Sequence, residues 1–451
     1  MNNKKLMKRR ILIGTLFTFL LFGASGLAQQ GTDALNLSLT EAQDYALSHN
    51  KAVINARADV EVSRAALWET ISAALPQVSM SATFADNLKL MTTLLPGEFF
   101  GQPGTKIPVT FGSQFNTSAS MDASLLLFNA PLYIGIETTR LAQKLSQQSL
   151  QKSELDTKES VSTAYFLILV TERSLQLLEE NIENMNELMK STRSMFSAGM
   201  AESTDVDQMV LNVTQVENSK TALERTIELN YNLLRFQLGV PAGTVLNLTE
   251  TLESLTESIN VEILLSQEFN HRQNIDFMLV EGQEMISELT LKSQKASTLP
   301  TLAGFYNYGK NGMGDKINDQ QWFDNSMIGL NLSVPIFAGG QRYSRIKQAQ
   351  INLEKARTTK EMVAEQLLLQ ESQLRYNLVN ANLQYMSQKD NLEVSKRVYE
   401  STENKFRQGM ASSIDLTQAS NQYLQAESNY LSALMDLLQT KVALDKLLNN
   451  I

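Results

Sequence analysis

FSAGMAESTDVDQ, residues 196–208, returns in the second half of the chain as FRQGMASSIDLTQ, residues 406–418. Seven of the thirteen positions are identical, at a constant offset of 210. Further towards the N-terminus, Leu75-Pro76 matches Leu299-Pro300 at an offset of 224, and Asn50 matches Asn274 at that same offset. A repeat at a fixed offset indicates a duplicated structural unit. The change of offset predicts an insertion in a loop after Pro76, because loops tolerate added length best.

Long helices are predicted on the N-terminal side of both copies of the repeated segment. Between Pro131 and Ser197 there is no other Pro and one Gly, and apolar residues recur with steps of three and four. That spacing is typical of a left-handed coiled coil, and Pro131 suits a first helical turn. A helix of this length is about 100 Å long. A similar helix is expected from Gln341 to Arg407, and rods of this kind exclude a compact globule.

The repeated segment itself is expected to reverse the chain. Gly199 and Gly409 can adopt the left-handed conformation that ends a helix. Hydroxyl side chains are the candidate caps of the returning helices, namely Ser203 or Thr204 in the first copy and Ser412 or Ser413 in the second. Asp205 and Asp415 then lie in a first helical turn, where a carboxylate complements the helix dipole. Capping alone would explain both aspartates.

Four segments alternate between apolar and polar residues and are predicted to be strands: 76–88, 116–128, 301–310 and 326–334. Each has about ten residues, which is the length that crosses a bilayer when a strand is tilted. An open sheet edge cannot lie in lipid, and four strands are too few to close a barrel. If these strands enter a membrane, the chain must therefore oligomerise.

Composition and the N-terminus narrow the class further. The 451 residues include no Cys, and 39 Lys and Arg stand against 48 Asp and Glu, for a net charge of −9. The absence of Cys excludes disulfides and thiolate metal sites, and the acidic balance argues against nucleic acid as a partner. Residues 1–28 have the basic, apolar and small-residue regions of a secretory signal. We therefore expect export from the cytoplasm.

Together these motifs resemble the TolC family of outer membrane efflux proteins. The resemblance rests on Leu-Ser-Leu-Thr-Glu-Ala at residues 37–42 with Tyr-Ala-Leu at 45–47, on Leu-Pro before the first strand of each half, and on the doubled Phe-x-x-Gly-x-x-x-x-x-Asp turn. It covers essentially the whole chain after the signal. It implies a mainly α protein with a small β part. Antiparallel coiled-coil helices would form an α-barrel, and four strands per chain would contribute to a trimeric 12-stranded transmembrane β-barrel.

The expected organisation follows the duplication. After the signal, residues 29–247 form a first repeat with a β-hairpin at 76–129 and a long helical hairpin that turns near 197–203. Residues 248–451 form a second repeat with short equatorial helices, a β-hairpin at 300–337 and a helical hairpin that turns near 407–413. Pro76 and Pro300 mark the start of the strands in the two repeats.

The resemblance also implies a function and partners. The chain would be a passive outer membrane exit duct in a Gram-negative cell, serving a tripartite efflux pump or type I secretion. A periplasmic adaptor would contact the helical turns at Gly199, Met200, Gly409 and Met410, and an inner-membrane pump of the RND, ABC or MFS type would supply energy. Asp205, Asp415 and Gln418 are candidate pore or gate residues as well as candidate caps. Packing of both methionines inside the turns is an equal alternative.

Two other classes of protein agree less well with the sequence. A periplasmic coiled-coil scaffold or adaptor without a membrane barrel explains the heptads but not four symmetrically placed strands. An enzyme is not expected, because His49 and His271 stand alone in helical contexts, with no metal-ligand spacing and no Cys. The sequence has no phosphate-binding loop, so energy for transport would have to come from a partner. We accordingly expect no catalytic residue, no metal and no cofactor.

Overall fold

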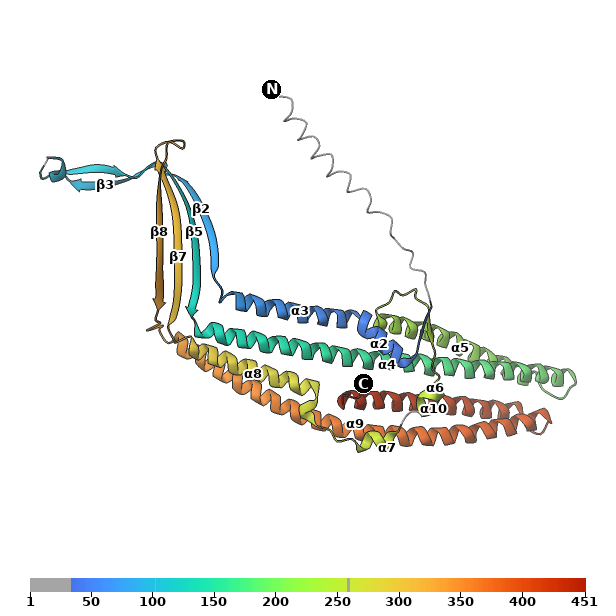
Figure 1. Ribbon diagram of the computed structural model, residues 1–451. Coiled ribbons are helices and arrows are strands. Elements are labelled where there is room, and N and C mark those ends of the chain that lie inside the picture. Colours follow the sequence, from blue (N-terminus) through green and yellow to red (C-terminus); the bar gives the residue numbers. More distant parts are fainter. Residues whose placement is uncertain (1–33, 102, 258–259) are drawn as a thin grey trace, which may run out of the picture.

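The computed structural model describes residues 34–101, 103–257 and 260–451. Figure 1 shows an elongated subunit in which long helices run side by side and a sheet rises from one end of them. The expected signal, residues 1–28, lies outside the described residues. Within those residues, no helix carries an apolar stretch long enough to cross a lipid bilayer.

Two helical hairpins form most of the subunit. Helix α4 (Ala130–Ser197) and helix α5 (Ser203–Leu238) make the first, and α9 (Gln341–Arg407) and α10 (Ser413–Leu447) make the second. The two rods predicted from the sequence are confirmed, because α4 has 68 residues and α9 has 67. The side chain of Asn129 accepts a hydrogen bond from the Leu132 N–H (3.0 Å), and Pro131 lies in the first turn of α4, where it leaves no hydrogen bond unmade.

Shorter helices extend the returning helices end to end. Helix α2 (Leu39–His49) leads into α3 (Lys51–Ser72), and the Asn50 side chain between them accepts a hydrogen bond from the Ala52 N–H (2.8 Å). The amide of Asn50 also donates to the carbonyl of Gln237 at the end of α5 (2.7 Å). Gly239 has a φ of 73°, and a Cβ there would lie 2.2 Å from the His49 carbonyl oxygen. Only Gly permits this approach of α5 to the α2–α3 junction.

The second repeat builds the same junction with Asn274. Its side chain accepts a hydrogen bond from the Asp276 N–H at the start of α8 (Ile275–Ala296, 2.9 Å) and donates to the Leu447 carbonyl at the end of α10 (3.3 Å). The sequence match between Asn50 and Asn274 is therefore a match of structural role.

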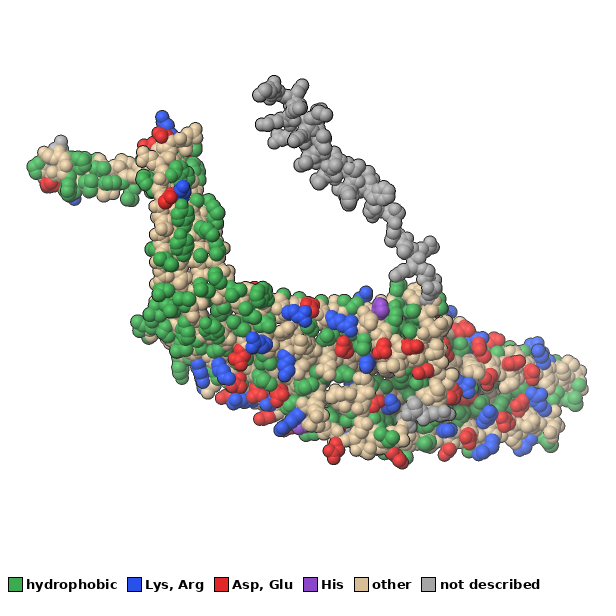
Figure 2. All heavy atoms as spheres, viewed as in Figure 1, with side chains coloured by type: hydrophobic (Ala, Val, Ile, Leu, Met, Phe, Trp, Pro, Cys, Tyr) green, Lys and Arg blue, Asp and Glu red, His purple; other side chains and the backbone are tan. Residues whose placement is uncertain are grey.

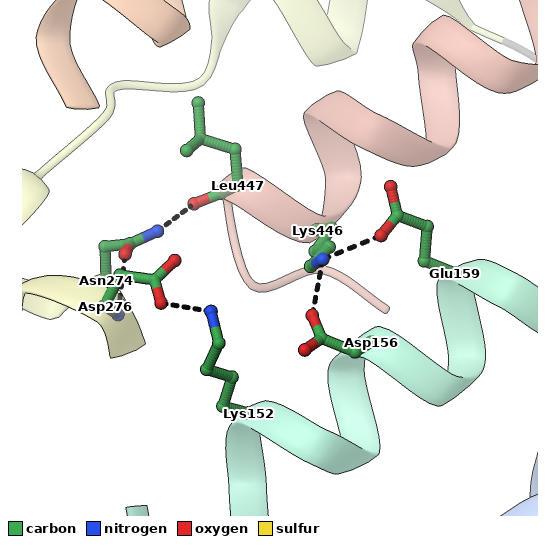
Figure 3. A network of polar contacts seen from close by, with 7 residues as sticks. All are labelled: Lys152, Asp156, Glu159, Asn274, Asp276, Lys446 and Leu447. Atoms are coloured by element: carbon green, nitrogen blue, oxygen red, sulfur yellow. Dashed lines mark hydrogen bonds and ion pairs between the residues drawn. The ribbon is translucent and has the colours of Figure 1, made fainter. Parts of the chain in front are cut away.

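A polar network surrounds this second junction (Figure 3). Lys446 of α10 forms ion pairs with Asp156 (2.5 Å) and Glu159 (2.7 Å) of α4, and Lys152 of α4 pairs with Asp276. The network joins three helices that are far apart in the sequence at the middle of the subunit.

One antiparallel sheet in the order β2-β5-β7-β8 lies at the shared end of α3, α4, α8 and α9. Its strands are β2 (Gln77–Asp86), β5 (Phe115–Phe128), β7 (Thr301–Gly314) and β8 (Gln321–Ser333). All four predicted strands are confirmed, although β7 runs four residues further than expected and β8 begins five residues earlier. Pro76 and Pro300 directly precede β2 and β7. β5 and β7 join the two repeats, and β2 and β8 are open edges.

An additional two-stranded hairpin was not predicted. It consists of β3 (Met91–Pro96), a 3₁₀ turn η1 (Gly97–Phe100) and β4 (Lys106–Phe111), and we call it the arm. The arm lies between β2 and β5, where residues 87–114 form the connection, whereas residues 315–320 connect β7 to β8. The extra length of the first repeat is thus in this loop. Its strands went unrecognised because Met-Thr-Thr-Leu-Leu-Pro does not alternate.

Short elements lie beside the middle of the helices. β1 (Leu35–Leu37) pairs in parallel with β6 (Leu246–Leu248), and both read Leu-Asn-Leu. Helices α6 (Leu252–Glu257) and α7 (Val261–Ser266) and the 3₁₀ turn η2 (His271–Gln273) follow β6. The expected boundary after residue 247 falls within β6. The largest buried cluster lies here, around Tyr165 of α4, whose hydroxyl donates to the Leu37 carbonyl (3.1 Å).

Candidate functional site

The first chain reversal is a complete Schellman motif at the far end of the helical hairpin. Gly199 has a φ of 74° and its N–H donates to the Phe196 carbonyl (3.0 Å). The N–H of Met200 donates to the Met195 carbonyl (2.9 Å). These bonds satisfy two of the carbonyls that the end of a helix leaves free. The predicted left-handed glycine is confirmed.

The second reversal has the same geometry. Gly409 has a φ of 72°, its N–H donates to the Phe406 carbonyl (2.9 Å), and the Met410 N–H donates to the Lys405 carbonyl (2.8 Å). The side chains of Met200 and Met410 are 75% and 66% exposed. In the single chain the methionines therefore point away from the turns rather than pack inside them.

The cap of the second returning helix agrees with the sequence, but the cap of the first does not. Ser412 caps α10, and the Asp415 N–H donates to its hydroxyl (3.2 Å). Helix α5 begins at Ser203, so its cap is Glu202 rather than Ser203 or Thr204. Helix α5 begins at the position equivalent to the start of α10, and Glu202 stands at the cap position in place of Ser412. The Asp205 carboxylate accepts the Glu202 N–H (3.0 Å), as the Asp415 carboxylate accepts the Ser412 N–H.

Asp205 also joins the two hairpins. Its other carboxylate oxygen accepts a hydrogen bond from the hydroxyl of Ser413, which is 4% exposed. The Ser413 hydrogen bond, together with the Glu202 N–H, lowers the pKa of Asp205 below its ordinary value. Near this contact the Asn212 amide donates to the Thr417 hydroxyl (2.9 Å). The sequence indicated Ser413 only as a possible cap, and no signal pointed to Asn212.

Among the described residues, Asp415 forms no such link. Its carboxylate accepts hydrogen bonds from the hydroxyl (2.7 Å) and N–H (3.0 Å) of Ser412, and these contacts lower its pKa. Gln418, one turn later, is exposed and lines an uncharged groove of about 570 Å³ between α5 and α10. The groove is lined by Gln208, Ile414, Thr417, Gln418, Asn421, Gln422 and Gln425.

The seam between the hairpins contains buried polar groups. Asn181 of α4, Tyr399 of α9 and Ser420 of α10 have buried side-chain polar atoms with no hydrogen-bond partner in the described part of the chain. Glu427 of α10 is 5% exposed, and burial raises its pKa, with the charge of Glu180 adding to the effect. Buried polar groups without partners weaken an interface.

The predicted site residues fall into two places. The turns bring Gly199, Met200, Gly409 and Met410 to one end of the subunit, together with the aspartates and Gln418 (Figure 1). Pro76 and Pro300 lie at the opposite end of the subunit, where α3 and α8 lead into the sheet. The end with the turns therefore carries the candidate contact and pore residues, and the end with the sheet presents exposed apolar strands.

Comparisons with known proteins agree with this architecture. The model of the family described as outer membrane efflux protein matches residues 43–240 and 285–450. The outer membrane protein TolC of Vibrio cholerae serotype O1 is 21% identical over 408 residues, which cover 88% of this chain and 87% of that protein. The outer membrane efflux protein BepC of Brucella suis biovar 1 is 22% identical over 429 residues, covering 93% of this chain and 87% of that protein.

A solved structure shows the same fold. The outer membrane protein VceC from Vibrio cholerae superposes with a TM-score of 0.71 at 14% identity, over 91% of this chain and 95% of that one. Because the family model spans both halves of the duplicated unit, the chain belongs to the outer membrane efflux protein family.

Proposed function

We propose that the chain is the outer membrane exit duct of a tripartite efflux pump or type I secretion system, which passively conducts substrates from the periplasmic side to the exterior. The family consists of channel proteins rather than enzymes. The observation that carries the proposal is a four-stranded sheet with two open edges, placed at one end of two helical hairpins of nearly equal length.

The proposed assembly is a homotrimer with a 12-stranded barrel. An open edge is not tolerated in lipid, and closing three sheets edge to edge removes all of the edges. The helical layer supports the same conclusion because large apolar side chains remain exposed on α9 and on α3 and α5. These side chains are Leu369, Tyr376 and Leu383 on α9, and Val62, Trp68, Leu229 and Phe236 on α3 and α5. Contact between α9 of one copy and α3 and α5 of the next would cover both sets.

The two repeats, 29–247 and 248–451, would then alternate around the pore. We propose that the turns form the periplasmic mouth and that Gly199, Met200, Gly409 and Met410 contact a periplasmic adaptor. The exposure of both methionines supports this role, since a flexible side chain adapts to a partner surface. An inner-membrane pump of the RND, ABC or MFS type would couple energy to the duct.

Asp415 is the proposed pore residue, with Gln418 beyond it. Three copies of Asp415 around an axis would concentrate negative potential at the mouth. Asp415→Asn is expected to change conductance or cation block in planar bilayers, and unchanged ion selectivity would place Asp415 outside the pore.

Fractionation of cells tests the proposal as a whole. The mature protein should be recovered with the outer membrane as a detergent-stable oligomer. Recovery as a soluble periplasmic protein would favour the alternative of a coiled-coil scaffold or adaptor.

A further inference from the structure

The arm projects from the strand ends that lie furthest from the helices. Figure 1 shows it leaving the sheet sideways, across the direction of the strands and past β8. Its base is held in place. The Asn87 N–H donates to the Gln114 carbonyl (2.8 Å), and the Gln114 N–H donates to Asp315 in the β7–β8 turn (3.3 Å). The direction of the arm therefore follows from contacts at the rim of the sheet.

The register of the arm separates its side chains into two faces. Residues opposite each other in an antiparallel pair lie on the same face. One face carries five apolar residues and one Thr: Met91, Phe111, Thr93, Val109, Leu95 and Ile107. The other face carries Thr92, Thr110, Leu94, Pro108, Pro96 and Lys106. The first face has no charge, and the second holds a cation.

The apolar face is only partly covered in the single chain, where Leu95, Ile107 and Val109 are half-buried and Phe111 is exposed. Met91 is 72% exposed, and Phe99 in the turn is 79% exposed. In Figure 2 apolar side chains cover much of the visible side of the arm. An isolated two-stranded hairpin is only marginally stable in water, so a face of this kind needs a partner.

We propose that the arm lies on the outer leaflet of the membrane, with this apolar face in the lipid interface. The inference rests on the proposed function. If the sheet crosses the bilayer, its far ends lie at the outer headgroup level, and an arm that leaves sideways runs along the membrane plane. Aromatic residues favour this level, and Phe99 and Phe100 form the end of the arm.

Charge favours the same occupant. Lys89 precedes β3 and Lys106 begins β4, whereas Glu98 is the only acidic residue between β2 and β5. The phosphates of the headgroup layer are anionic and would attract these lysines. A second copy that added a strand to the arm is disfavoured by Pro96 and Pro108, because Pro has no N–H to donate.

The chain has no Cys, so single-Cys variants report on single positions. Met91→Cys and Thr92→Cys are matched neighbours on opposite faces, and both native side chains are exposed. Each variant is labelled with an environment-sensitive fluorophore and reconstituted into vesicles of zwitterionic and anionic phospholipid, with a quencher attached at the top of the acyl chains, just below the headgroups. Apolar faces of interfacial elements sit about 5–10 Å into this layer. The label at position 91 should shift to the blue and lose most of its emission, and the label at position 92 should do neither.

Ile328→Cys in β8 separates the two levels of the proposal. Ile328 is 82% exposed in the single chain and would face lipid if the sheet crosses the bilayer. If its label escapes a quencher placed in the acyl region, the proposed membrane position of the sheet fails. If Ile328→Cys is quenched while positions 91 and 92 give equal signals, the membrane position stands and the inference about the arm is overturned. A photo-crosslinker at position 91 that joins two chains would also overturn it, in favour of a second copy.

Discussion

Ser413→Ala should weaken the contact between the two helical hairpins at the mouth, and so favour their separation, without changing the charge of the protein. Ser413 of α10 donates its hydroxyl to Asp205 of α5, and this bond joins the two repeats next to the turns. Alanine removes the donor and leaves the helix backbone intact. The adjacent residue offers a matched control, because Ser412 caps α10 by bonding to Asp415 and makes no hydrogen bond to the other hairpin in the described part of the chain.

The expected magnitude follows from the partly exposed carboxylate. A hydrogen bond to a charged group contributes about 1.5–3 kcal/mol, and solvent screening reduces this to about 1 kcal/mol here. That corresponds to roughly a fivefold shift of the joined–parted equilibrium in each chain, and to roughly a hundredfold shift if three chains part together. Ser412→Ala should cost about 1 kcal/mol of helix stability without this shift.

Single-channel recordings in planar bilayers measure the shift as the fraction of time spent in high-conductance states. Ser413→Ala should raise this fraction well above that of Ser412→Ala. Equal effects of the two variants would refute the reasoning, because the bond between the hairpins would then contribute nothing beyond capping.

The same contact predicts a pH profile. The hydrogen bonds from Ser413 and from the Glu202 N–H lower the pKa of Asp205 below 3.8. The ionised carboxylate therefore stabilises the contact between the hairpins above pH 3.8, and this stabilisation is lost only as the pH falls through the lowered pKa. The difference between wild type and Ser413→Ala in the fraction of time spent in high-conductance states should therefore be constant from neutral pH down to the ordinary Asp range. A difference that vanished near neutrality would contradict the assignment of Asp205 as the acceptor.

Three further outcomes are expected for purified protein in detergent, each measured as a thermal midpoint. Gly239→Ala should lower the midpoint more than Gly199→Ala. Both variants carry the cost of a left-handed Ala, about 1–2 kcal/mol, but only the Cβ at position 239 meets backbone atoms, which adds about 1–3 kcal/mol. Equal midpoints would contradict the close approach of α5 to the α2–α3 junction. Asn274→Ala should cost roughly 2–3 kcal/mol, because it removes a helix cap and leaves the Leu447 carbonyl without its donor; a midpoint unchanged from wild type would refute this role. The raised pKa of Glu427 means that wild type should lose stability as the pH rises above 4.5 through that pKa, and Glu427→Gln should remove this dependence; an unchanged slope would argue that Glu427 is hydrated.

The sequence allowed the helical rods, the turns and the four strands to be predicted because each depends on a local signal. Period, an absence of Pro and a Gly at the helix end are sufficient to predict α4 and α9 and to place the left-handed turns at Gly199 and Gly409. The identity of Asn50 and Asn274 also carried information, although their role became clear only with the ends of α5 and α10 in place.

What was missed depends on distant partners. The link from Ser413 to Asp205 needs two hairpins side by side. The cap of α5 is a local exception, because residue preference favours Ser203 or Thr204 over Glu202. The arm was missed because β3 does not alternate along the sequence, and its two faces are defined only by its pairing with β4, where Met91 lies opposite Phe111. Local patterns predict elements, whereas contacts between elements require their arrangement.

The duplication extends this argument to contacts between copies. Adding the offset of 210 maps Asp205 onto Asp415 and relates Ser203 to Ser413. Within one chain α10 packs on α4, as the contact of Leu188 with α10 shows. In the proposed ring the equivalent neighbours are α9 and α5 of the next copy. The counterpart of the bond from Ser413 to Asp205 is then a bond from Ser203 of one copy to Asp415 of the adjacent copy.

The second contact at the mouth maps in the same way. Asn212 and Thr417 correspond to Gln422 and Asp207, again an amide donor and an oxygen acceptor. Both counterpart pairs are exposed in the single chain, as expected of groups that find their partners in a neighbour. Each hairpin therefore has hydrogen-bonding side chains on both of its neighbouring surfaces, although the residue types differ between the contact within a chain and the proposed contact between chains.

Cysteine pairs distinguish the two kinds of contact, because a disulfide requires Cβ atoms about 3.5–4.5 Å apart. Oxidation of Ser203→Cys with Asp415→Cys should link chains into dimers and trimers on a denaturing gel, whereas Asp205→Cys with Ser413→Cys should close within one chain. If the first pair links only within a chain, the copies do not follow the repeat symmetry at the mouth. If it links between chains, six Ser–Asp contacts hold the mouth, three within chains and three between chains. Ser413→Ala then loosens only the three that lie within chains.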